Sequence, residues 1–413
     1  MLILKKNHLN ILMPVLAFAS LILFLPIAFL YEKGGRVIFY YCAYFSMLGL
    51  LVEVCKRKKI KLGNRKALSI LILGVMFIGW SLYVKYYIGE EGEFYFTAGK
   101  RCFLAFAIIN YQFYIFRENY LSKSLMIKGC ALSLSLAFIT SSAFAFIQGF
   151  TSDDRIVLGI NRATLTAYAY SIMTLALITC VMKLQKSNFK YLFFLLVSII
   201  SLYVIMLTQT RSAMVIHTLF LVYMTFNLFS ATRNVKFISV VSLLMLIAVG
   251  LSYKVIETRF ESTVQEYRDY EHGNDRTSLG SRFTMWKTGI LAFEHAPFGQ
   301  SQVERNNFII AYLNAHNQKD SWAIFYINVH LHNEFIQYAS LFGVVGVLVL
   351  LYFFYTFIIV ELRAKRSLTP LAAVAIATLL YGMTDVILTS IEFIAIFSVL
   401  VILLLLIEEK DEK

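Results

Sequence analysis

Two histidines, His330 and His332, stand one residue apart in the block Asn328-Val-His-Leu-His-Asn-Glu334. If this block is extended, alternate side chains point to the same side, so the two imidazoles share a face. Histidine titrates near neutral pH, and one of the pair could act as a general base that takes a proton from an attacking hydroxyl. A metal site and a pair of hydrogen-bonded interfacial histidines are the alternatives. We expect no metal and no other cofactor, because neither an HExxH nor a CxxC motif accompanies the pair.

Arginines form the second chemical feature of the chain. Arg211 ends the block Leu207-Thr-Gln-Thr-Arg211, and Arg282 ends the block Ser278-Leu-Gly-Ser-Arg282. A guanidinium is planar, stays charged and matches phosphate oxygens, so arginines gathered at the depth of the lipid headgroups suit a phosphate or a diphosphate. The alternative for Arg211 is a side chain that only extends toward the headgroups. Further cations that we expect on the same side of the membrane are Arg155 in Asp153-Asp-Arg155, Arg162, Lys100 and Arg101.

Two acidic residues, Asp385 and Glu392, lie within or between the last two apolar stretches. An ionisable side chain is costly in the hydrocarbon, so such residues are functional candidates by default. Asp385 could instead pair with one of the arginines. His217 lies about 9 Å from Arg211 by helical rise and is expected to be a packing residue.

The composition indicates the solvent around these residues. Of the 413 residues, 59% are apolar and 15% are charged, and the mean hydropathy is +0.69. Soluble domains average about 45–50% apolar and about 25% charged residues. The composition therefore excludes a soluble enzyme, a secreted disulfide scaffold and a disordered chain. The net charge of +13 would suggest nucleic acid as the partner of a soluble protein, but here we expect membrane lipids and no nucleic acid.

Apolar stretches that are long enough to cross a membrane occur along the whole chain. Helices are the expected form, since lipid offers no partner for an unpaired backbone group. The sequence predicts an all-α polytopic membrane protein with about 12 transmembrane helices, which form a single membrane domain over residues 1–413. The stretches run roughly over 9–31, 37–54, 67–88, 97–116, 125–148, 164–182, 191–207, 212–230, 237–253, 333–357, 370–389 and 391–407.

The placement of basic residues orients these spans. More than half of the 38 Lys and Arg residues fall in cytoplasmic segments if the N-terminus is inside and the spans alternate. Both termini are then cytoplasmic. Residues 254–332 form a long periplasmic loop between the ninth and tenth spans. The five cysteines all lie outside this loop, so no disulfide framework is expected.

Part of the long loop is expected to be helical. Ser278 or Ser281 can cap a helix that Pro297 and Gly299 end. This helix would either lie in the outer membrane interface or pack against the membrane domain. Its apolar face would consist of Phe283, Trp286, Ile290 and Phe293, with Trp286 as the interfacial anchor.

Together these residues suggest glycosyl transfer from a lipid-linked diphosphate. The leaving diphosphate needs its charge neutralised, which arginines can do in place of a divalent metal. The incoming hydroxyl needs a base on the opposite face of the anomeric carbon, and one positioned histidine is enough. Displacement along this line inverts the anomeric centre, as the two-face geometry of inverting glycosidases illustrates.

On these blocks the chain resembles the bacterial O-antigen ligase family of the enteric type, within the superfamily of O-antigen ligases and polymerases. The resemblance runs from about residue 151 to 390, whereas residues 1–150 contribute only spans. The residues that carry it are Asp154-Arg155-Ile156, Leu207–Arg211, Ser278–Trp286, Asn328–Glu334 followed by Ser340, Leu341 and Gly343, and Asp385.

The resemblance implies roles for individual residues. His332 matches the family's essential histidine, which is proposed to activate the acceptor hydroxyl. Arg211 and Arg282 match its essential arginines, placed to bind the donor diphosphate, and Arg155 and Asp385 match further positions of the pattern. Additional candidates in or near these blocks are His330, Gln209, Glu334 and Lys100.

The resemblance also implies the reaction and the fold. The family transfers O-polysaccharide from undecaprenyl diphosphate to the outer-core sugar of lipid A-core, on the periplasmic face of the inner membrane, without metal or nucleotide. Its fold is all-helical and similar to the C-type glycosyltransferases. An O-antigen polymerase that uses the same donor is the alternative. A transporter or flippase of lipid-linked saccharides fits less well, because only Pro14 and Pro26 lie deep in a span.

Overall fold

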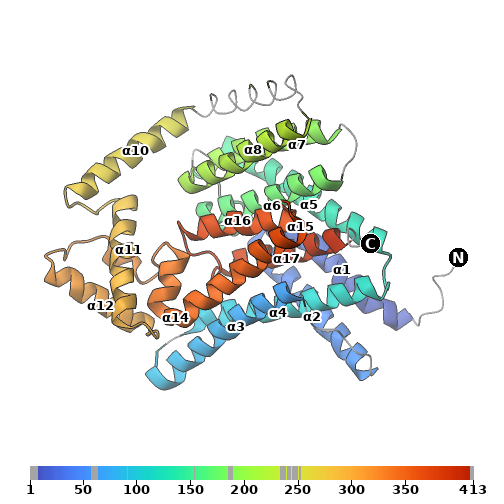
Figure 1. The fold of residues 1–413 in the computed structure, drawn as a ribbon, viewed down its shortest axis with the longest axis horizontal. Coiled ribbons are helices and arrows are strands. Elements are labelled where there is room, and N and C mark those ends of the chain that lie inside the picture. Colours follow the sequence, from blue (N-terminus) through green and yellow to red (C-terminus); the bar gives the residue numbers. More distant parts are fainter. Residues whose placement is uncertain are drawn as a thin grey trace.

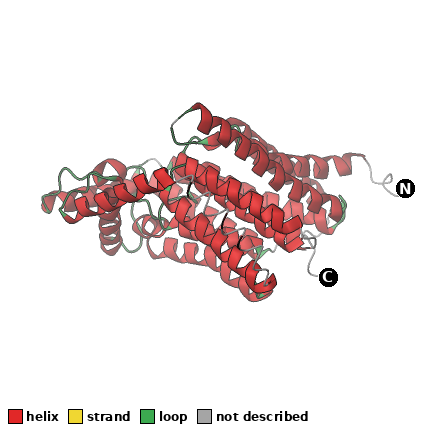
Figure 2. Ribbon diagram, turned by 90° about the horizontal axis from the view of Figure 1, so that it is seen from above, coloured by secondary structure: helices red, strands yellow, loops and turns green. Residues whose placement is uncertain are grey.

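The computed structural model describes residues 8–56, 64–90, 92–152, 154–184, 189–232 and 253–409, together with the single residues 239, 243 and 250. Throughout these residues the regular structure is helical, and they contain no strand (Figure 2). The predicted all-α class is therefore confirmed. Most helices form one bundle, and a group of helices projects from one end of it (Figure 1).

Eight helical segments of the described residues are long and apolar enough to cross a membrane, as expected for a polytopic membrane protein. They are α1 (His8–Ala28), α2 (Glu32–Cys55), α3 (Arg65–Tyr83) with η1 (Val84–Ile88), α5 (Lys123–Thr151), α6 (Ala163–Leu184), α7 (Phe189–Leu207), α14 (Glu334–Phe354) with η3 (Tyr355–Ile359) and α15 (Val360–Lys365), and α17 (Ile391–Glu408). Two further helices, α4 (Glu93–Arg117) and α8 (Arg211–Thr232), cover the predicted stretches 97–116 and 212–230. The predicted stretch 237–253 lies almost entirely outside the described residues.

The predicted stretch 370–389 is only partly helical, which corrects one boundary. α16 (Pro370–Gly382) ends after 13 residues, and residues 383–390 form turns and bends before α17 begins. The carboxylate of Glu334 accepts hydrogen bonds from two backbone amides of this segment. These amides are thereby satisfied without a helix. Asp385 consequently lies between the last two helices of the bundle rather than within a span.

α17 forms the centre of the bundle. Its side chains are buried from Phe393 to Glu408, as expected for a helix that is apolar on every side. It contacts α4, α5 and α6, and α6 is also mostly buried. The segment that carries Asp385 therefore joins α16 directly to the most buried helix of the bundle.

Four described helices between α8 and α14 form what we call the loop layer: α10 (Tyr253–Glu271), α11 (Ser278–His295), α12 (Gln302–Ala315) and α13 (Ala323–Tyr326). α11 packs against α14 and joins this layer to the bundle (Figure 1). The layer has a small apolar core of its own, which consists of Met285, Ala292, Ile309, Leu313, Ala323, Ile327 and Leu331.

α11 is the helix predicted in the long loop, with two differences. Its N-cap is Thr277, whose side chain accepts a hydrogen bond from the amide of Gly280, rather than Ser278 or Ser281. The buried face is also offset from the predicted apolar face, and Ile290 is 49% exposed. The reason is that small residues allow α11 to approach its neighbours closely. The buried residues are Gly280, Ser281, Thr284, Met285, Thr288, Gly289 and Ala292.

A break in α14 connects the loop layer to the bundle through backbone atoms. Gly343 has φ of +63° and ψ of −153°, a conformation that residues with a Cβ rarely adopt. At this break the amide of Val344 donates to the carbonyl of Pro297, and the amide of Gln300 donates to the carbonyl of Leu341. A Cβ at position 343 would lie 2.4 Å from the Pro297 oxygen. Glycine is therefore required at this position.

Candidate active site

The two histidines connect the loop layer to the start of α14. Leu331, which lies between them, is fully buried in the core of the loop layer, and its amide donates to the side chain of Gln337. His330 and His332 are both half-buried, and their ring centroids lie 4.2 Å apart. The two rings therefore lie together as the spacing predicts, although His332 has a φ of +51° and the backbone is not extended at this residue.

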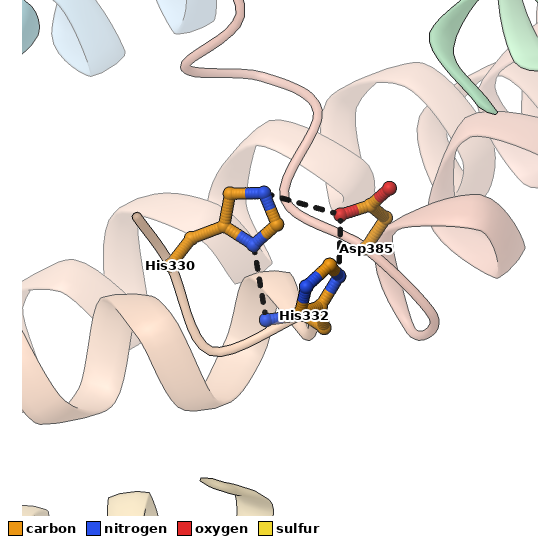
Figure 3. A group of neighbouring side chains, drawn as sticks. All are labelled: His330, His332 and Asp385. Atoms are coloured by element: carbon orange, nitrogen blue, oxygen red, sulfur yellow. Dashed lines mark hydrogen bonds and ion pairs between the residues drawn. The ribbon is translucent and has the colours of Figure 1, made fainter. Parts of the chain in front are cut away.

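Asp385 contacts both imidazoles (Figure 3). Its Oδ1 lies 3.2 Å from Nδ1 of His332 and 3.6 Å from Nε2 of His330. The contact with His332 has the length of a hydrogen bond but not its alignment. Nδ1 of His330 accepts a hydrogen bond from the backbone amide of His332, so the proton of a neutral His330 is on Nε2 and faces the carboxylate. In His332 the carboxylate favours a proton on Nδ1, which leaves Nε2 able to accept one.

Burial and charge set the protonation of this histidine group, defined as His330, His332 and Asp385. Burial lowers the pKa of His330 to about 4, and the charges of nearby arginines act in the same direction against the attraction of Asp385. His330 is therefore neutral at neutral pH. Burial alone would raise the pKa of Asp385, but the contact with His332 and the neighbouring positive charges hold it below its usual range. Asp385 is therefore a carboxylate, placed to stabilise a protonated His332.

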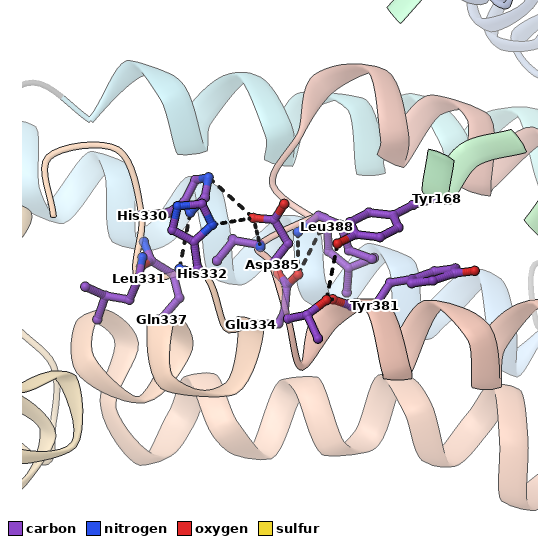
Figure 4. A network of polar contacts seen from close by, with 12 residues as sticks. Tyr168, His330, Leu331, His332, Glu334, Gln337, Tyr381, Asp385 and Leu388 are labelled. Atoms are coloured by element: carbon purple, nitrogen blue, oxygen red, sulfur yellow. Dashed lines mark hydrogen bonds and ion pairs between the residues drawn. The ribbon is translucent and has the colours of Figure 1, made fainter. Parts of the chain in front are cut away.

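The two residues after His332 attach the histidines to the segment that carries Asp385, and Figure 4 shows the contacts of the second, Glu334. Asn333 caps α14 by accepting hydrogen bonds from two of its first amides, and its Nδ2 donates to a carbonyl of residues 383–390. The buried carboxylate of Glu334 accepts from two amides of the same segment, at 2.6 and 3.1 Å. The distance between His332 and Asp385 is therefore fixed by bonds to the backbone on both sides.

A buried arginine of α12 fixes the other end of the histidine block. Arg305 is fully buried and donates to the carbonyl of Ile327 at 2.7 Å and to Oε1 of Gln337 at 3.0 Å. The same Oε1 accepts the amide of Leu331. Burial lowers the pKa of Arg305 to about 10, which still leaves it charged at neutral pH. The sequence predictions do not include Arg305, because nothing in its local pattern separates it from the exposed charges of the loop.

The other half of the site is built on the turn between α7 and α8. Arg155 donates from Nε to the carbonyl of Thr208 at 2.9 Å, and from Nη2 to Oγ1 of Thr210 at 3.0 Å. Burial lowers the pKa of Arg155, and the positive charges of three other arginines lower it further. Each of these three arginines is therefore close enough to Arg155 to repel it. We call the four the arginine cluster: Arg155, Arg211, Arg259 and Arg282.

Two members of the arginine cluster join α10 to the turn between α7 and α8: Arg211, from the start of α8, and Arg259, which lies on α10 itself. Nη2 of Arg211 donates to the carboxylate of Glu266 at 2.5 Å and to Oγ of Ser262 at 3.0 Å. Arg259 donates to the side chain of Gln209, which stands at the tip of the turn with φ of +51°. Arg259 and Glu266 are not among the predicted residues. Their spacing with Ser262, three and four residues apart on one helical face, is the signal that would have found them.

Arg282 connects the two halves of the site. Its positive charge acts on Arg155 of the arginine cluster and also on Asp385 and His330 of the histidine group. It is half-buried and forms no hydrogen bond or ion pair with any residue that the structure describes. An unpaired guanidinium in this position suits an anion whose other end reaches the arginine cluster. The predicted residues that the structure brings together here are Arg155, Gln209, Arg211, Arg282, His330, His332, Glu334 and Asp385.

Other residues singled out in the sequence lie elsewhere. Lys100 of α4 is exposed, and its Nζ lies over a tyrosine ring at 5.7 Å from the centroid. Glu392 pairs with Arg36 at 3.1 Å. His217 is buried between two serine hydroxyls, as expected for a packing residue. Asp153 lies outside the described residues.

The histidine group also has the donors of a metal site. One donor atom from each of His330, His332 and Asp385 lies within 4.8 Å of the others. Imidazole and carboxylate are ordinary zinc ligands, and three of them with an open position are typical of a catalytic site. The same side chains thus suit either a divalent ion or a carboxylate–imidazole base. Removal of metal ions separates these two possibilities.

Comparison with known proteins gives two matches. The O-Antigen ligase family model matches residues 196–351, a region that contains Arg211, Arg282 and both histidines. A curated protein of Escherichia coli (strain K12), named O-antigen ligase, is 30% identical over 285 residues. The aligned region covers 67% of this chain and 66% of that relative, which is just under two thirds of the relative's length.

Proposed function

Since the chain belongs to the O-antigen ligase family, we propose that it is a membrane glycosyltransferase of lipopolysaccharide assembly. It transfers O-polysaccharide from undecaprenyl diphosphate to the outer-core sugar of lipid A-core. The observation that carries this proposal is the position of Arg282, whose charge acts on both the arginine cluster and the histidine group. An anion-binding site and a base therefore lie side by side, as a reaction with a diphosphate leaving group requires.

The arginine cluster binds the donor diphosphate. When the bond between the anomeric carbon and the diphosphate oxygen breaks, negative charge accumulates on the leaving undecaprenyl diphosphate. Guanidinium groups of Arg155, Arg211 and Arg282 stabilise this charge through hydrogen bonds that strengthen as it develops. No proton has to be delivered to a leaving group of this acidity, so the site needs cations rather than a general acid.

The histidine group activates the acceptor. Nε2 of His332 takes the proton of the core-sugar hydroxyl while the hydroxyl oxygen forms its bond to the anomeric carbon. Asp385, which is held ionised 3.2 Å from Nδ1, stabilises the resulting imidazolium without accepting the proton. Attack from the side opposite the diphosphate inverts the anomeric centre.

The proposed reaction takes place on the periplasmic face of the inner membrane, with both termini in the cytoplasm. The support is the excess of Lys and Arg in the segments that alternate with the loop layer. Labelling with a membrane-impermeant maleimide tests this orientation. Phe325→Cys in the loop layer, where the native side chain is 72% exposed, should react in spheroplasts. The native exposed Cys55 should react only after permeabilisation, and the reverse pattern would contradict the orientation.

Lipopolysaccharide from a deletion strain tests the function. We expect lipid A-core without attached polysaccharide, together with accumulated polysaccharide on the lipid carrier, and both should be reversed by the gene on a plasmid. The second candidate is an O-antigen polymerase, which the matching donor chemistry favours. Loss of a polymerase would instead leave lipid A-core that carries a single repeat, so the banding pattern separates the two functions.

A further inference from the structure

Glu266 of α10 bridges two groups that bind anions. Its Oε1 accepts from Nη2 of Arg211 at 2.5 Å, and its Oε2 accepts from the backbone amide of Leu279 at 2.8 Å. The Glu266 side chain is only 14% exposed. Leu279 is in the first turn of α11, where backbone amides have no partner within the helix. A carboxylate of the protein thus occupies a position between a guanidinium and a helix N-terminus.

A guanidinium and a backbone amide at the start of a helix are also groups that bind phosphate. Phosphate oxygens bind to guanidinium forks and to the free amides at the start of a helix, for the same reasons of charge and geometry as a carboxylate. The two N–H groups of Arg211 Nη2 are already used by Ser262 and Glu266. A phosphate oxygen that takes the place between Nη2 and the start of α11 must therefore displace the Glu266 carboxylate.

The balance of charge makes the exchange favourable for a diphosphate. Glu266 is the only carboxylate, among the residues that the structure describes, that pairs with a member of the arginine cluster. Within hydrogen-bond distance, one carboxylate therefore faces four guanidinium groups, while Asp385 acts on Arg282 without a direct bond. A diphosphate brings more negative charge and more acceptor oxygens than one carboxylate, so it can replace Glu266 and gain contacts with Arg155 and Arg282.

The helix that carries Glu266 is held largely by polar contacts. α10 packs on α11, and its inward-facing polar side chains hold it to the turn between α7 and α8. Ile256 packs against the core of the bundle and the Tyr270 ring lies 5.2 Å from that of Phe283, whereas Phe260 and Tyr267 are 69% and 49% exposed. Loss of the Arg211 contact would therefore remove one of the few links between α10 and the turn between α7 and α8.

We propose that Glu266 holds the place of a donor diphosphate oxygen in the donor-free protein, and that the diphosphate displaces it and so breaks the contact between α10 and Arg211. This inference rests on the proposed function, since it takes the donor to be an undecaprenyl diphosphate. Before the diphosphate binds, the Glu266 carboxylate keeps Arg211 and the start of α11 in position for it. The exchange also couples donor binding to a movement of the loop layer.

Binding of undecaprenyl diphosphate to the full-length protein in lipid nanodiscs tests the first part. Glu266→Gln retains an oxygen that accepts the Leu279 amide but loses the competing charge, so we expect its Kd to fall about tenfold. Glu257→Gln is the matched control, because Glu257 is exposed on the same helix and, among the described residues, accepts only from the hydroxyl of Tyr253. Its Kd should equal that of the unchanged protein. Arg211→Ala should lose binding.

A distance measurement tests the displacement itself. Spin labels at Glu261→Cys in α10 and Asn307→Cys in α12, both exposed positions, report the separation of these helices. Adding undecaprenyl diphosphate should lengthen or broaden this distance, and Glu266→Gln should show part of the change without ligand. Unchanged or weaker binding by Glu266→Gln, with binding still dependent on Arg211, would overturn this inference and leave the proposed function intact. Absence of binding in every variant would overturn both.

Discussion

The histidine group and the arginine cluster differ in how the chain holds them. The histidine group is fixed mainly through backbone bonds, because Asn333, Glu334 and Gln337 each bind main-chain atoms on one side of it or the other. The arginine cluster is assembled from long side chains of separate segments, and one of its contacts is to a single carboxylate of α10. Proton transfer requires reacting atoms at a defined separation, whereas neutralisation of a large anion requires charge that can adjust to it. The difference in construction fits the proposed roles of the two halves.

Removal of the base should have the largest effect. His332→Ala should abolish the joining of polysaccharide to lipid A-core while the protein remains inserted, since a positioned general base contributes roughly 10²–10⁴-fold in rate. Complementation of a ligase-deficient strain, with immunoblotting of the membrane fraction, measures both properties. His217→Ala is a control for a histidine outside the site. Normal ligation by His332→Ala would exclude it as the base.

Replacement of the Arg211 guanidinium by an ammonium group should be nearly as damaging as loss of the base. Arg211→Lys should lose ligation by about 10²-fold, close to the loss in Arg211→Ala, because an ammonium cannot reproduce the paired hydrogen bonds of a guanidinium. Steady-state transfer with purified donor and acceptor measures it. Arg276→Lys, in the exposed pair with Asp320, is the matched control and should be unaffected. If Arg211→Lys retained near-normal transfer, Arg211 would be only a headgroup anchor. The proposed difference between the histidine group and the arginine cluster would then not hold.

Loss of the Asn333 hydrogen bonds should have an intermediate effect. It distinguishes a role of Asn333 in positioning Asp385 from a role in stability alone. Asn333→Ala removes the N-cap of α14, at a cost of about 1 kcal/mol in unfolding free energy, and also frees the segment with Asp385. We expect transfer to fall roughly tenfold in kcat, with KM for the donor unchanged. Ser122→Ala removes the cap of α5 alone and is the matched control. Equal losses in the two variants would mean that Asn333 acts only through stability.

Chelation should have the smallest effect. Treatment with EDTA should leave transfer unchanged, because the arginine cluster supplies the positive charge and His332 supplies the base. Transfer assays before and after dialysis check this. Loss of activity that a divalent ion restores would assign the histidine group to a metal and would remove the proposed distinction between the two halves.

The sequence could predict those parts of the site that lie in short blocks. His330, His332 and Arg211 stand out because their spacing or flanking residues are local patterns. Arg305 and Arg259 do not, since their roles depend on partners such as Gln337 and Gln209, which lie 32 and 50 residues away. Local periodicity therefore indicates which residue types are present but not which long-range partner each one meets.

The fold was predictable to a similar degree. Apolar length alone predicts an all-helical membrane protein, because lipid leaves the backbone no other solution. Local periodicity did not predict the features that depend on contacts with neighbouring helices. α11 buries its small residues against α14, although its larger apolar residues lie on another face. The helix after Pro370 stops early because a distant carboxylate, that of Glu334, binds the amides that follow.

The bond from Glu334 to the segment that carries Asp385 has a consequence for biosynthesis. Asp385 follows every member of the arginine cluster and both histidines along the chain, and Ile387, which binds Glu334, is 53 residues beyond it. A nascent chain that ends before Asp385 therefore contains the arginine cluster and both histidines but lacks the carboxylate beside His332. Under the proposed mechanism, such a chain would bind a donor without transferring it. Catalytic competence would then be acquired only after the segment between α16 and α17 has been made.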